Sequence, residues 1–342
     1  MYRKFLHIAI AAAAVIIASI PVRAQSDAMF TQYYEVPTFY NPGAIGTSDY
    51  MRFRALSRMQ WIGIKHAPTT FAITGDAPLK LFNKRFGVGL VLQQETEGLY
   101  KNMSFGVQLG YKFKLLKGEF SAALQIGMVD ESFDGSKIHI PDDDDYHESA
   151  DEGLPTSNVR GNALDLGIGV HYTHKYFWAG LSCTHVNSPT ITFDSDSGGS
   201  STSGGESGDG DSSSGNSKNY EFQVHRALYF MGGSNIPIKN TLFEVIPSVM
   251  VASDFTFTTF EATARVRWKK FLSGGVGYRY EDALSVMLSA EYKGFFLGYS
   301  YDYPLSAISR ASSGSHEIMA GYSLKLDFSE KNKNRHKSIR IM

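Results

Sequence analysis

The sequence predicts an all-β fold, an antiparallel transmembrane outer-membrane β-barrel of about 14 strands. Three observations lead to this prediction. Apolar and polar residues alternate over runs that are long enough to cross a bilayer. The connections between these runs alternate between short and long, and the chain opens with a secretory signal.

The alternation is clearest in MSFGVQLGYKF, residues 103–113, where every second residue is apolar and the residues between them are small or polar. A tilted strand of about 9–11 residues is enough to cross the hydrocarbon core. Comparable runs predict strands near 50–60, 68–77, 85–95, 101–114, 119–130, 161–173, 176–187, 220–234, 241–252, 255–268, 271–280, 283–292, 295–303 and 315–328.

The connections between the predicted strands differ on the two sides of the barrel. Connections after even-numbered strands are mostly tight, whereas 131–160, 188–219 and 304–314, all after odd-numbered strands, are long. Outer-membrane barrels have short periplasmic turns and long extracellular loops, and their strand number is even. We therefore expect the outer membrane as the location, with 131–160 and 188–219 as the long extracellular loops.

The N-terminus has the three parts of a signal peptide: basic Arg3 and Lys4, an apolar run over 6–20, and a small-residue cleavage site ending at Ala24. We expect residues 1–24 to be the signal peptide and 25–49 to form an N-terminal segment. The barrel is expected over 50–328 and a basic periplasmic tail over 329–342. After the signal, no run of about 18 apolar residues predicts a membrane helix.

Composition limits the possible partners. Removing residues 1–24 lowers the number of basic residues from 33 to 30, against 34 acidic residues, so the mature chain is mildly acidic. This balance argues against a nucleic-acid partner. The single cysteine, Cys183, allows no intramolecular disulfide.

Residues 29–46, MFTQYYEVPTFYNPGAIG, are rich in aromatic residues and have neither a helical nor a strand period. The inward faces of the predicted strands carry charges of both signs and many glycines, which favours internal ion pairing and leaves room in the lumen. We expect residues 27–46 to form a lumen plug or a strap across the periplasmic mouth, with a turn at Asn41-Pro42-Gly43. A leader without fixed structure is the alternative.

Signatures of catalysis are missing from the sequence. It contains no Gly-x-Ser-x-Gly elbow before a helix, no phosphate-binding loop and no cysteine pair, so we expect neither an enzyme nor a cofactor. The candidates for binding a divalent cation such as calcium are Asp142, Asp143, Asp144 and Asp145. A solvated acidic loop explains the same residues.

The predicted short turns are basic and the predicted long loops are acidic. The turns carry Lys80, Lys84, Lys114, Lys117, Lys175, Lys239, Lys269, Lys270 and Lys293. Both sets of charges keep the rims of a barrel hydrated. A basic periplasmic surface that docks another envelope component is the more specific interpretation.

Four groups of residues carry a resemblance to a known family. They are Gln32 and Tyr33; Asn41 and Pro42; Arg58, Gln60, Trp61 and Gly63; and Ala67, Pro68, Thr69 and Thr70. In this order and spacing the chain resembles the PorP/SprF family, whose members are outer-membrane barrels of the type IX secretion and gliding apparatus of Bacteroidota. The resemblance implies membrane lipid, a secreted surface protein or adhesin, and periplasmic components of the machinery as partners. These motif residues are therefore the candidate partner-binding or structural residues.

Two functions remain open at this point. The first is a platform that anchors or helps to export a surface protein or adhesin and links it to periplasmic components. The second is a porin or transporter with a water-filled pore. Residues 61–70 are expected to form the first outward hairpin, where exposed apolar side chains meet the plug, another loop or an exported client.

Overall fold

The computed structural model describes residues 27–82, 84–137, 157–195 and 220–326. The strands of the barrel wall are β1 (Tyr50–Met59), β2 (Thr69–Leu81), β3 (Lys84–Glu97), β4 (Tyr100–Leu115), β5 (Gly118–Asp134), β6 (Asn158–Thr173), β7 (Phe177–Thr184), β10 (Ala227–Ser234), β12 (Phe243–Ser253), β13 (Thr258–Trp268), β14 (Leu272–Arg279), β15 (Ala283–Tyr292), β16 (Phe295–Pro304) and β17 (Ser315–Lys325). Three further strands are β8 (Thr190–Ser195), β9 (Tyr220–Gln223) and β11 (Ile236–Pro237).

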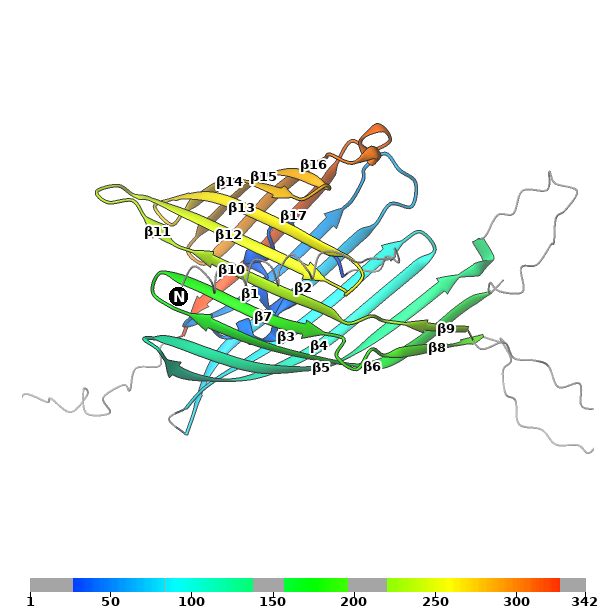
Figure 1. Cartoon of the computed structure of the whole chain (residues 1–342), viewed down its shortest axis with the longest axis horizontal. Coiled ribbons are helices and arrows are strands. Elements are labelled where there is room, and N and C mark those ends of the chain that lie inside the picture. Colours follow the sequence, from blue (N-terminus) through cyan, green and yellow to red (C-terminus); the bar gives the residue numbers. More distant parts are fainter. Residues whose placement is uncertain (1–26, 83, 138–156, 196–219, 327–342) are drawn as a thin grey trace, which may run out of the picture.

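The wall is a closed antiparallel barrel of 14 strands (Figure 1). It closes because β1, the first strand, pairs with β2 on one side and with β17, the last strand, on the other. Neither β1 nor β17 therefore leaves an open edge. β10 pairs with β7 and β12, which completes the ring across the long connection after β7. The predicted fold is confirmed, and each predicted strand overlaps one strand of the wall.

Two of the predicted boundaries were wrong. The run 220–234, predicted as one strand, is divided into β9 and β10, and the predicted loop 188–219 contains β8. β8 and β9 pair with each other as a hairpin, and β8 joins the wall only where Val159 and Arg160 of β6 meet its last residues. The alternating pattern continues through this hairpin, so the pattern alone does not reveal where the chain leaves the wall.

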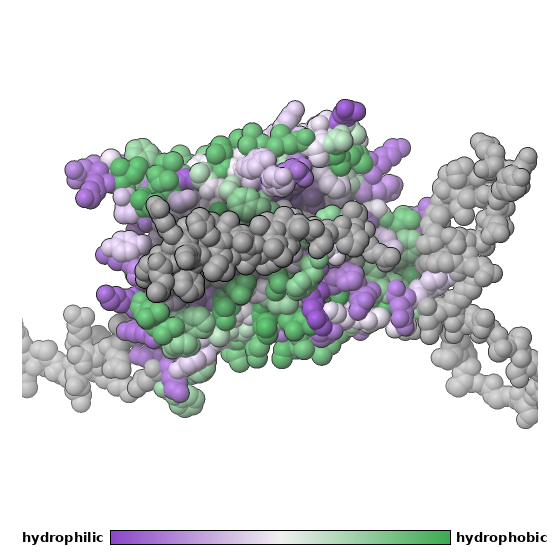
Figure 2. All heavy atoms as spheres, viewed as in Figure 1, coloured by the Kyte–Doolittle hydropathy of each residue, from purple (hydrophilic) through white to green (hydrophobic). Residues whose placement is uncertain are grey.

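The outer surface carries an apolar band with polar rims at its two ends (Figure 2). Alternate side chains of each strand point outward, and those at mid-wall are apolar and exposed, such as Leu124, Ile126, Leu288 and Leu297. A band of this kind on a closed barrel is the surface that faces lipid. Within the described residues, no helix is both long and apolar enough to cross a membrane.

The two ends of the barrel differ in their connections. At the short-turn end, the links from β2 to β3, β4 to β5, β6 to β7, β13 to β14 and β15 to β16 have only two or three residues. Leu116 and Lys117 both have positive φ, 45° and 65°, as do Lys269 and Lys270, at 51° and 56°. Paired positive φ values suit the tight turns whose twist matches the flanking strands.

At the opposite, long-loop end, β4, β5 and β6 extend beyond their neighbours (Figure 1). The β8–β9 hairpin packs against the inner face of this extension, with Ile191 and Phe193 buried against Val129, Phe133 and Val159. Gly161 of β6 makes the close approach possible, because a Cβ there would collide with the carbonyl oxygen of Thr192. The extension therefore has a small hydrophobic core of its own.

Candidate functional site

The lumen of the barrel holds the N-terminal part of the described chain, residues 27–46, which we call the lumen segment (Figure 1). It contains two single turns of 3-10 helix, η1 (Tyr33–Glu35) and η2 (Pro42–Ala44), and one turn of α-helix, α2 (Pro37–Tyr40). Pro37 and Pro42 each begin one of these turns, where the missing N–H costs nothing and the fixed φ is already helical. Short turns separated by proline explain why the segment shows no sequence period.

The aromatic side chains of the lumen segment form its own core. Tyr40 accepts a hydrogen bond from the N–H of Phe30 (2.8 Å) and donates one to the carbonyl of Ala28 (3.0 Å). The rings of Phe30 and Phe39 lie 4.8 Å apart, edge to face. Burial of these rings stabilises the fold, and the hydroxyl of Tyr40 satisfies two backbone groups that have no regular partner.

The segment is held at the long-loop end by a buried network that includes Thr31. The Thr31 hydroxyl donates to Asp302 (2.7 Å), and the guanidinium of Arg58 bonds to both Thr31 (3.1 Å) and Asp302 (2.7 Å). Glu317 accepts the backbone N–H groups of Thr31 (2.9 Å) and Gln32 (3.0 Å). We call Thr31, Arg58, Asp302 and Glu317 the Arg58 network. Every member is buried, so the charges of Arg58 and Glu317 depend on their partners for compensation, and Asp302 also lies 3.7 Å from Arg279.

A second anchor at the same end holds Asp27. Its carboxylate accepts from Tyr229 (2.6 Å) and lies 3.1 Å from Nε2 of His185, whose Nδ1 is 2.8 Å from Asp165. Burial acts to lower the pKa of His185, but the charge of Asp27 and the hydrogen bonds to Asp165 and Asp27 outweigh it and raise this pKa to about 10. Burial acts to raise the pKa of Asp27, but the charge of His185 and the hydrogen bonds that Asp27 accepts hold it below its ordinary range.

In the middle of the lumen, cationic side chains of the wall meet the segment. Glu35 lies 3.5 Å from Arg54 of β1 and 3.7 Å from Arg265 of β13. The guanidinium of Arg265 also stacks over the ring of Tyr34, at 3.2 Å from the centroid. The expected internal ion pairing is present elsewhere in the wall, as between Arg279 and Glu261 (3.0 Å).

Near the short-turn end, Asn41 and Gly43 fit the segment against the wall. The Asn41 side chain accepts from the N–H of Gly43 (2.7 Å) and donates to the carbonyl of Val170 on β6 (3.0 Å). It occupies the space above Gly169 and Gly180, where added Cβ atoms would overlap it. Glycine at these wall positions leaves room for an amide side chain that comes from the lumen.

The last residues of the segment are held by two wall side chains. The N–H of Gly46 donates to Asp76 of β2 (2.8 Å), and Lys112 of β4 donates to the carbonyl of Gly46. Asp27 lies beside the long-loop end of β7, and Gly46 lies beside the short-turn end of β4. The segment therefore runs the length of the lumen before Tyr50 begins β1.

The sequence-predicted motif residues fall into two places. Gln32, Tyr33, Asn41 and Pro42 lie in the lumen, and Arg58 joins them through Thr31. The others lie at the long-loop end: the N–H of Gln60 donates to the carbonyl of Pro68 (2.9 Å), that of Trp61 to the hydroxyl of Ser315 (3.1 Å), and the hydroxyl of Thr70 to Glu95 (3.0 Å). Gly63 (φ 106°) and Thr69 complete this group. Asp142, Asp143, Asp144 and Asp145 lie outside the described residues.

Several residues of the site lie outside the set that the sequence predicts. Asp27, Thr31, His185, Asp302 and Glu317 belong to the two anchors at the long-loop end but are not among the predicted site residues. Asp302 and Glu317 occupy inward positions of β16 and β17, and charge at an inward position was the available signal. Neither pattern nor spacing indicates which charges on opposite sides of a barrel will meet.

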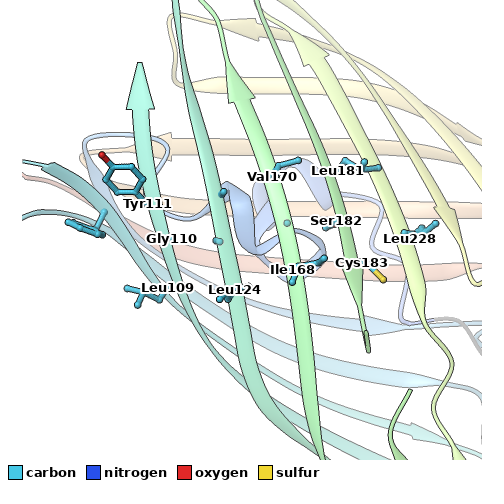
Figure 3. A pocket seen from close by; sticks show the side chains of 14 residues that line it. Leu109, Gly110, Tyr111, Leu124, Ile168, Val170, Leu181, Ser182, Cys183 and Leu228 are labelled. Atoms are coloured by element: carbon cyan, nitrogen blue, oxygen red, sulfur yellow. The ribbon is translucent and has the colours of Figure 1, made fainter. Parts of the chain in front are cut away.

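Outside the lumen, a groove of about 650 Å³ lies on the outer surface of the wall between β4 and β10 (Figure 3). Leu109, Leu124, Ile168, Leu181 and Leu228 point into it from successive strands. Its lining is almost entirely apolar and lies within the band that faces lipid. The groove therefore offers apolar packing surface.

Comparison with known proteins identifies the family of the chain. A family model described as "Type IX secretion system membrane protein PorP/SprF" matches residues 22–322 of the chain. The chain belongs to the PorP/SprF family. This PorP/SprF protein is an outer-membrane protein, so its short-turn end is periplasmic and its long-loop end is extracellular. The family and the fold are those of secretion and transport barrels.

No curated protein sequence matches this PorP/SprF chain. Among solved structures, the Pseudomonas putida toluene transporter TodX is similar at 8% identity and a TM-score of 0.46, over 85% of this chain and 94% of that one. A Pseudomonas aeruginosa FadL homologue matches at 8% identity and a TM-score of 0.44, over 84% and 93%. The translocator domain of the autotransporter NalP from Neisseria meningitidis matches at 10% identity and a TM-score of 0.39, over 81% and 87%.

Proposed function

We propose that this protein is a closed outer-membrane platform of the type IX secretion and gliding machinery. Its extracellular end anchors, or helps to export, a surface protein or adhesin, and its periplasmic end links that client to other components of the machinery. The observation that carries the proposal is the occupied lumen. A segment that is bound at both ends of the barrel blocks the path of solutes through the lumen. The barrel can then still hold partners at its two ends.

The energetic cost of removing the segment supports a closed barrel. Withdrawal would expose the rings of Phe30, Tyr33 and Tyr40, all fully buried, and would leave Asp302 and Glu317 without their partners on Thr31. Full burial of one such side chain contributes about 1.5–3 kcal/mol. Breaking buried charge networks adds several kcal/mol more. A porin that conducts solutes continuously needs an open lumen, and a segment bound this strongly would keep the lumen closed.

The periplasmic rim supports the second half of the proposal. The lysines of its turns are all exposed, among them Lys117, Lys175, Lys269 and Lys270. A ring of lysines on one end of a membrane protein attracts a partner with an acidic surface. The predicted tail at 329–342 and its basic residues belong to the same proposal.

Conductance and affinity isolation test the two halves separately. Purified full-length protein in planar bilayers should be almost silent, and a variant lacking residues 28–45 should conduct. Steady, large conductance by the wild-type protein would favour the porin instead.

For the partner, the double variant Lys269→Glu/Lys270→Glu should lose periplasmic components when the barrel is isolated from gently solubilised envelopes. The matched control is Lys65→Glu/Lys101→Glu, two exposed lysines at the extracellular end. Equal recovery of partners with both double variants would contradict a basic docking surface.

A further inference from the structure

A row of polar side chains crosses the inner face of the wall near its extracellular end. In the strand register, Thr70 of β2 is opposite Glu95 of β3, Glu95 is opposite Asn102 of β4, and Asn102 is opposite Glu131 of β5. Residues paired in this way share one face of the sheet, so all four side chains point into the lumen. Asn102 thus lies between two glutamates.

Two oxygen atoms of this row lack a partner among the described residues. They are Oε2 of Glu131 and Oδ1 of Asn102, and both atoms are buried. Glu131 as a whole is only 3% exposed, with Val129 and Phe133 buried on either side of it on the same face. Asn102 gives Glu131 one side-chain hydrogen bond, but a buried carboxylate without a countercharge is strongly unfavourable, so something must compensate its charge.

The charged groups near the row are acidic. Glu97 and Asp130 lie close to Glu131, and Glu97 and Asp27 lie close to Glu95. Asp130 points outward and is paired with Arg160 (2.9 Å), and Asp27 is paired with His185. In the part of the chain that the structure describes, neither Glu95 nor Glu131 forms an ion pair with Lys, Arg or His.

We propose that Glu95, Asn102 and Glu131 bind a divalent cation, Ca²⁺, at the extracellular end of the lumen. The backbones of β3 and β5, with β4 between them, are about 9.6 Å apart. Two carboxylate oxygens on opposite sides of one Ca²⁺ ion are about 5 Å apart. Each glutamate side chain therefore has to lean toward Asn102 by only about 2.3 Å, within the reach of its three rotatable bonds. Thr70 and Gln93 each donate to one oxygen of Glu95, which orients the carboxylate and leaves lone pairs free.

The β8–β9 hairpin brings a further oxygen to this place. Glu131 is opposite Gly161 of β6, and the carbonyl oxygen of Thr192 lies against Gly161 on the lumen side. Carboxylate, amide and carbonyl oxygens are the ligands that Ca²⁺ takes in proteins, with water completing six to eight positions. The cation would thereby tie β3, β4 and β5 to the hairpin.

The number of carboxylates sets the expected affinity. Among the described residues, no group of three or more His, Cys, Asp or Glu side chains could hold a metal ion, so this site has two carboxylates and neutral oxygens. Few charged ligands and bound water suit the affinity of extracellular calcium modules, with a Kd of about 10⁻⁴–10⁻³ M. The site is at the end of the barrel that meets the external medium.

The test is thermal unfolding of the purified full-length protein in detergent after treatment with EGTA, titrated with CaCl₂. We expect the melting temperature to rise with a midpoint of about 10⁻⁴–10⁻³ M. We also expect slower proteolysis of the β8–β9 hairpin in CaCl₂. Glu131→Gln and Glu95→Gln are isosteric, and each should fold and weaken the calcium response at least tenfold.

Two control variants separate this site from its neighbours. Asp130→Asn, which removes the adjacent outward carboxylate, should keep the response. Replacing Asp142, Asp143, Asp144 and Asp145 together by Asn should also keep it. The proposal is overturned if this quadruple variant abolishes the response while Glu131→Gln keeps it. It also fails if the wild-type melting temperature ignores CaCl₂ and rises only as the pH falls, since a proton on Glu131 would then compensate the charge.

Discussion

Arg58 near the extracellular end of β1 and Asp302 near the same end of β16 form a buried ion pair, 2.7 Å between Nη2 and Oδ2. Both side chains also bond to the hydroxyl of Thr31 in the lumen segment. β17 separates the two strands in the wall, and its Glu317 lies 3.5 Å from Arg58. One arginine thus joins three strands of the wall to the segment inside it.

Replacing this arginine should destabilise the folded barrel. Arg58→Met removes the ion-pair partner of the buried Glu317 and leaves the buried Asp302 with only Arg279, at 3.7 Å. The loss of one partner of a buried pair costs about 3–5 kcal/mol. The heat-modifiable shift in gel mobility should move to lower temperature, and the lumen segment should become cleavable by protease. Arg160→Met is the matched control, because Arg160 is exposed and solvent screens its pair with Asp130. Equal losses in the two variants would contradict the role of burial.

A methyl group on the wall should displace the lumen segment. At Gly169 an added Cβ would overlap the Asn41 side chain, so Gly169→Ala should loosen the segment near the periplasmic end while the barrel still forms. We expect faster cleavage near Tyr33 in detergent and measurable conductance. The control is Gly274→Ala, where the nearest atoms would be 3.8 Å away. If the two variants resist protease equally, the fit of Asn41 above Gly169 does not hold the segment.

The anchor at Asp27 should weaken at alkaline pH. The folded pKa of His185, about 10, lies above its ordinary value of 6.5, so the stability it contributes is complete below about pH 6.5 and is lost as the pH rises through about 10. The pKa of Asp27 is lowered, so the stability that its charge contributes is lost only as the pH falls into the acid range. Proteolysis of the lumen segment should therefore be slower at pH 6 than at pH 10.

Substitution of the histidine tests this pH dependence. His185→Gln keeps a hydrogen-bonding side chain without the charge and should remove most of the difference between pH 6 and pH 10. His66→Gln, a change at an exposed loop position, should leave the difference intact. An unchanged pH profile in His185→Gln would mean that another group titrates.

Trp61 should matter for the client rather than for the barrel. Its backbone N–H donates to the hydroxyl of Ser315, and the residue is half-buried, with the exposed Ile62 next to it at the extracellular end. Trp61→Ala should preserve heat-modifiable folding and reduce the amount of surface protein retained on cells. Phe255→Ala is the control, since Phe255 is a more exposed aromatic residue on another extracellular connection. Normal client display by a folded Trp61→Ala barrel would count against the interaction.

The sequence was sufficient for the wall because a half-buried strand imposes a local rule on every second residue. Residues 103–113 alternate without interruption, and β4 covers the whole run. The lengths of the connections also predicted which end of the barrel is periplasmic and which is extracellular. The rule failed at 220–234, because a hairpin strand that packs on the inner face of the β4–β6 extension has the same alternation as a strand that continues the wall.

The candidate site was only partly predictable. The glycines on the inner faces and the aromatic, non-periodic segment at 29–46 pointed to an occupied lumen, and Gly87, Gly89 and Gly169 indeed lie against Ile45 or Asn41 of that segment. The Arg58 network was not predictable, since Thr31 and Glu317 are 286 positions apart. Charges so distant in sequence meet only when the barrel closes.

By itself the sequence determined that the chain folds into strands with one apolar and one polar face, because that alternation is local. Only the tertiary structure decided which polar side chains meet inside. Closure of 14 strands brings the first and last of them together and turns separate inward charges into shared ion pairs. The compensation of a buried charge depends on distances across the lumen, and the order of residues along the chain does not encode those distances directly.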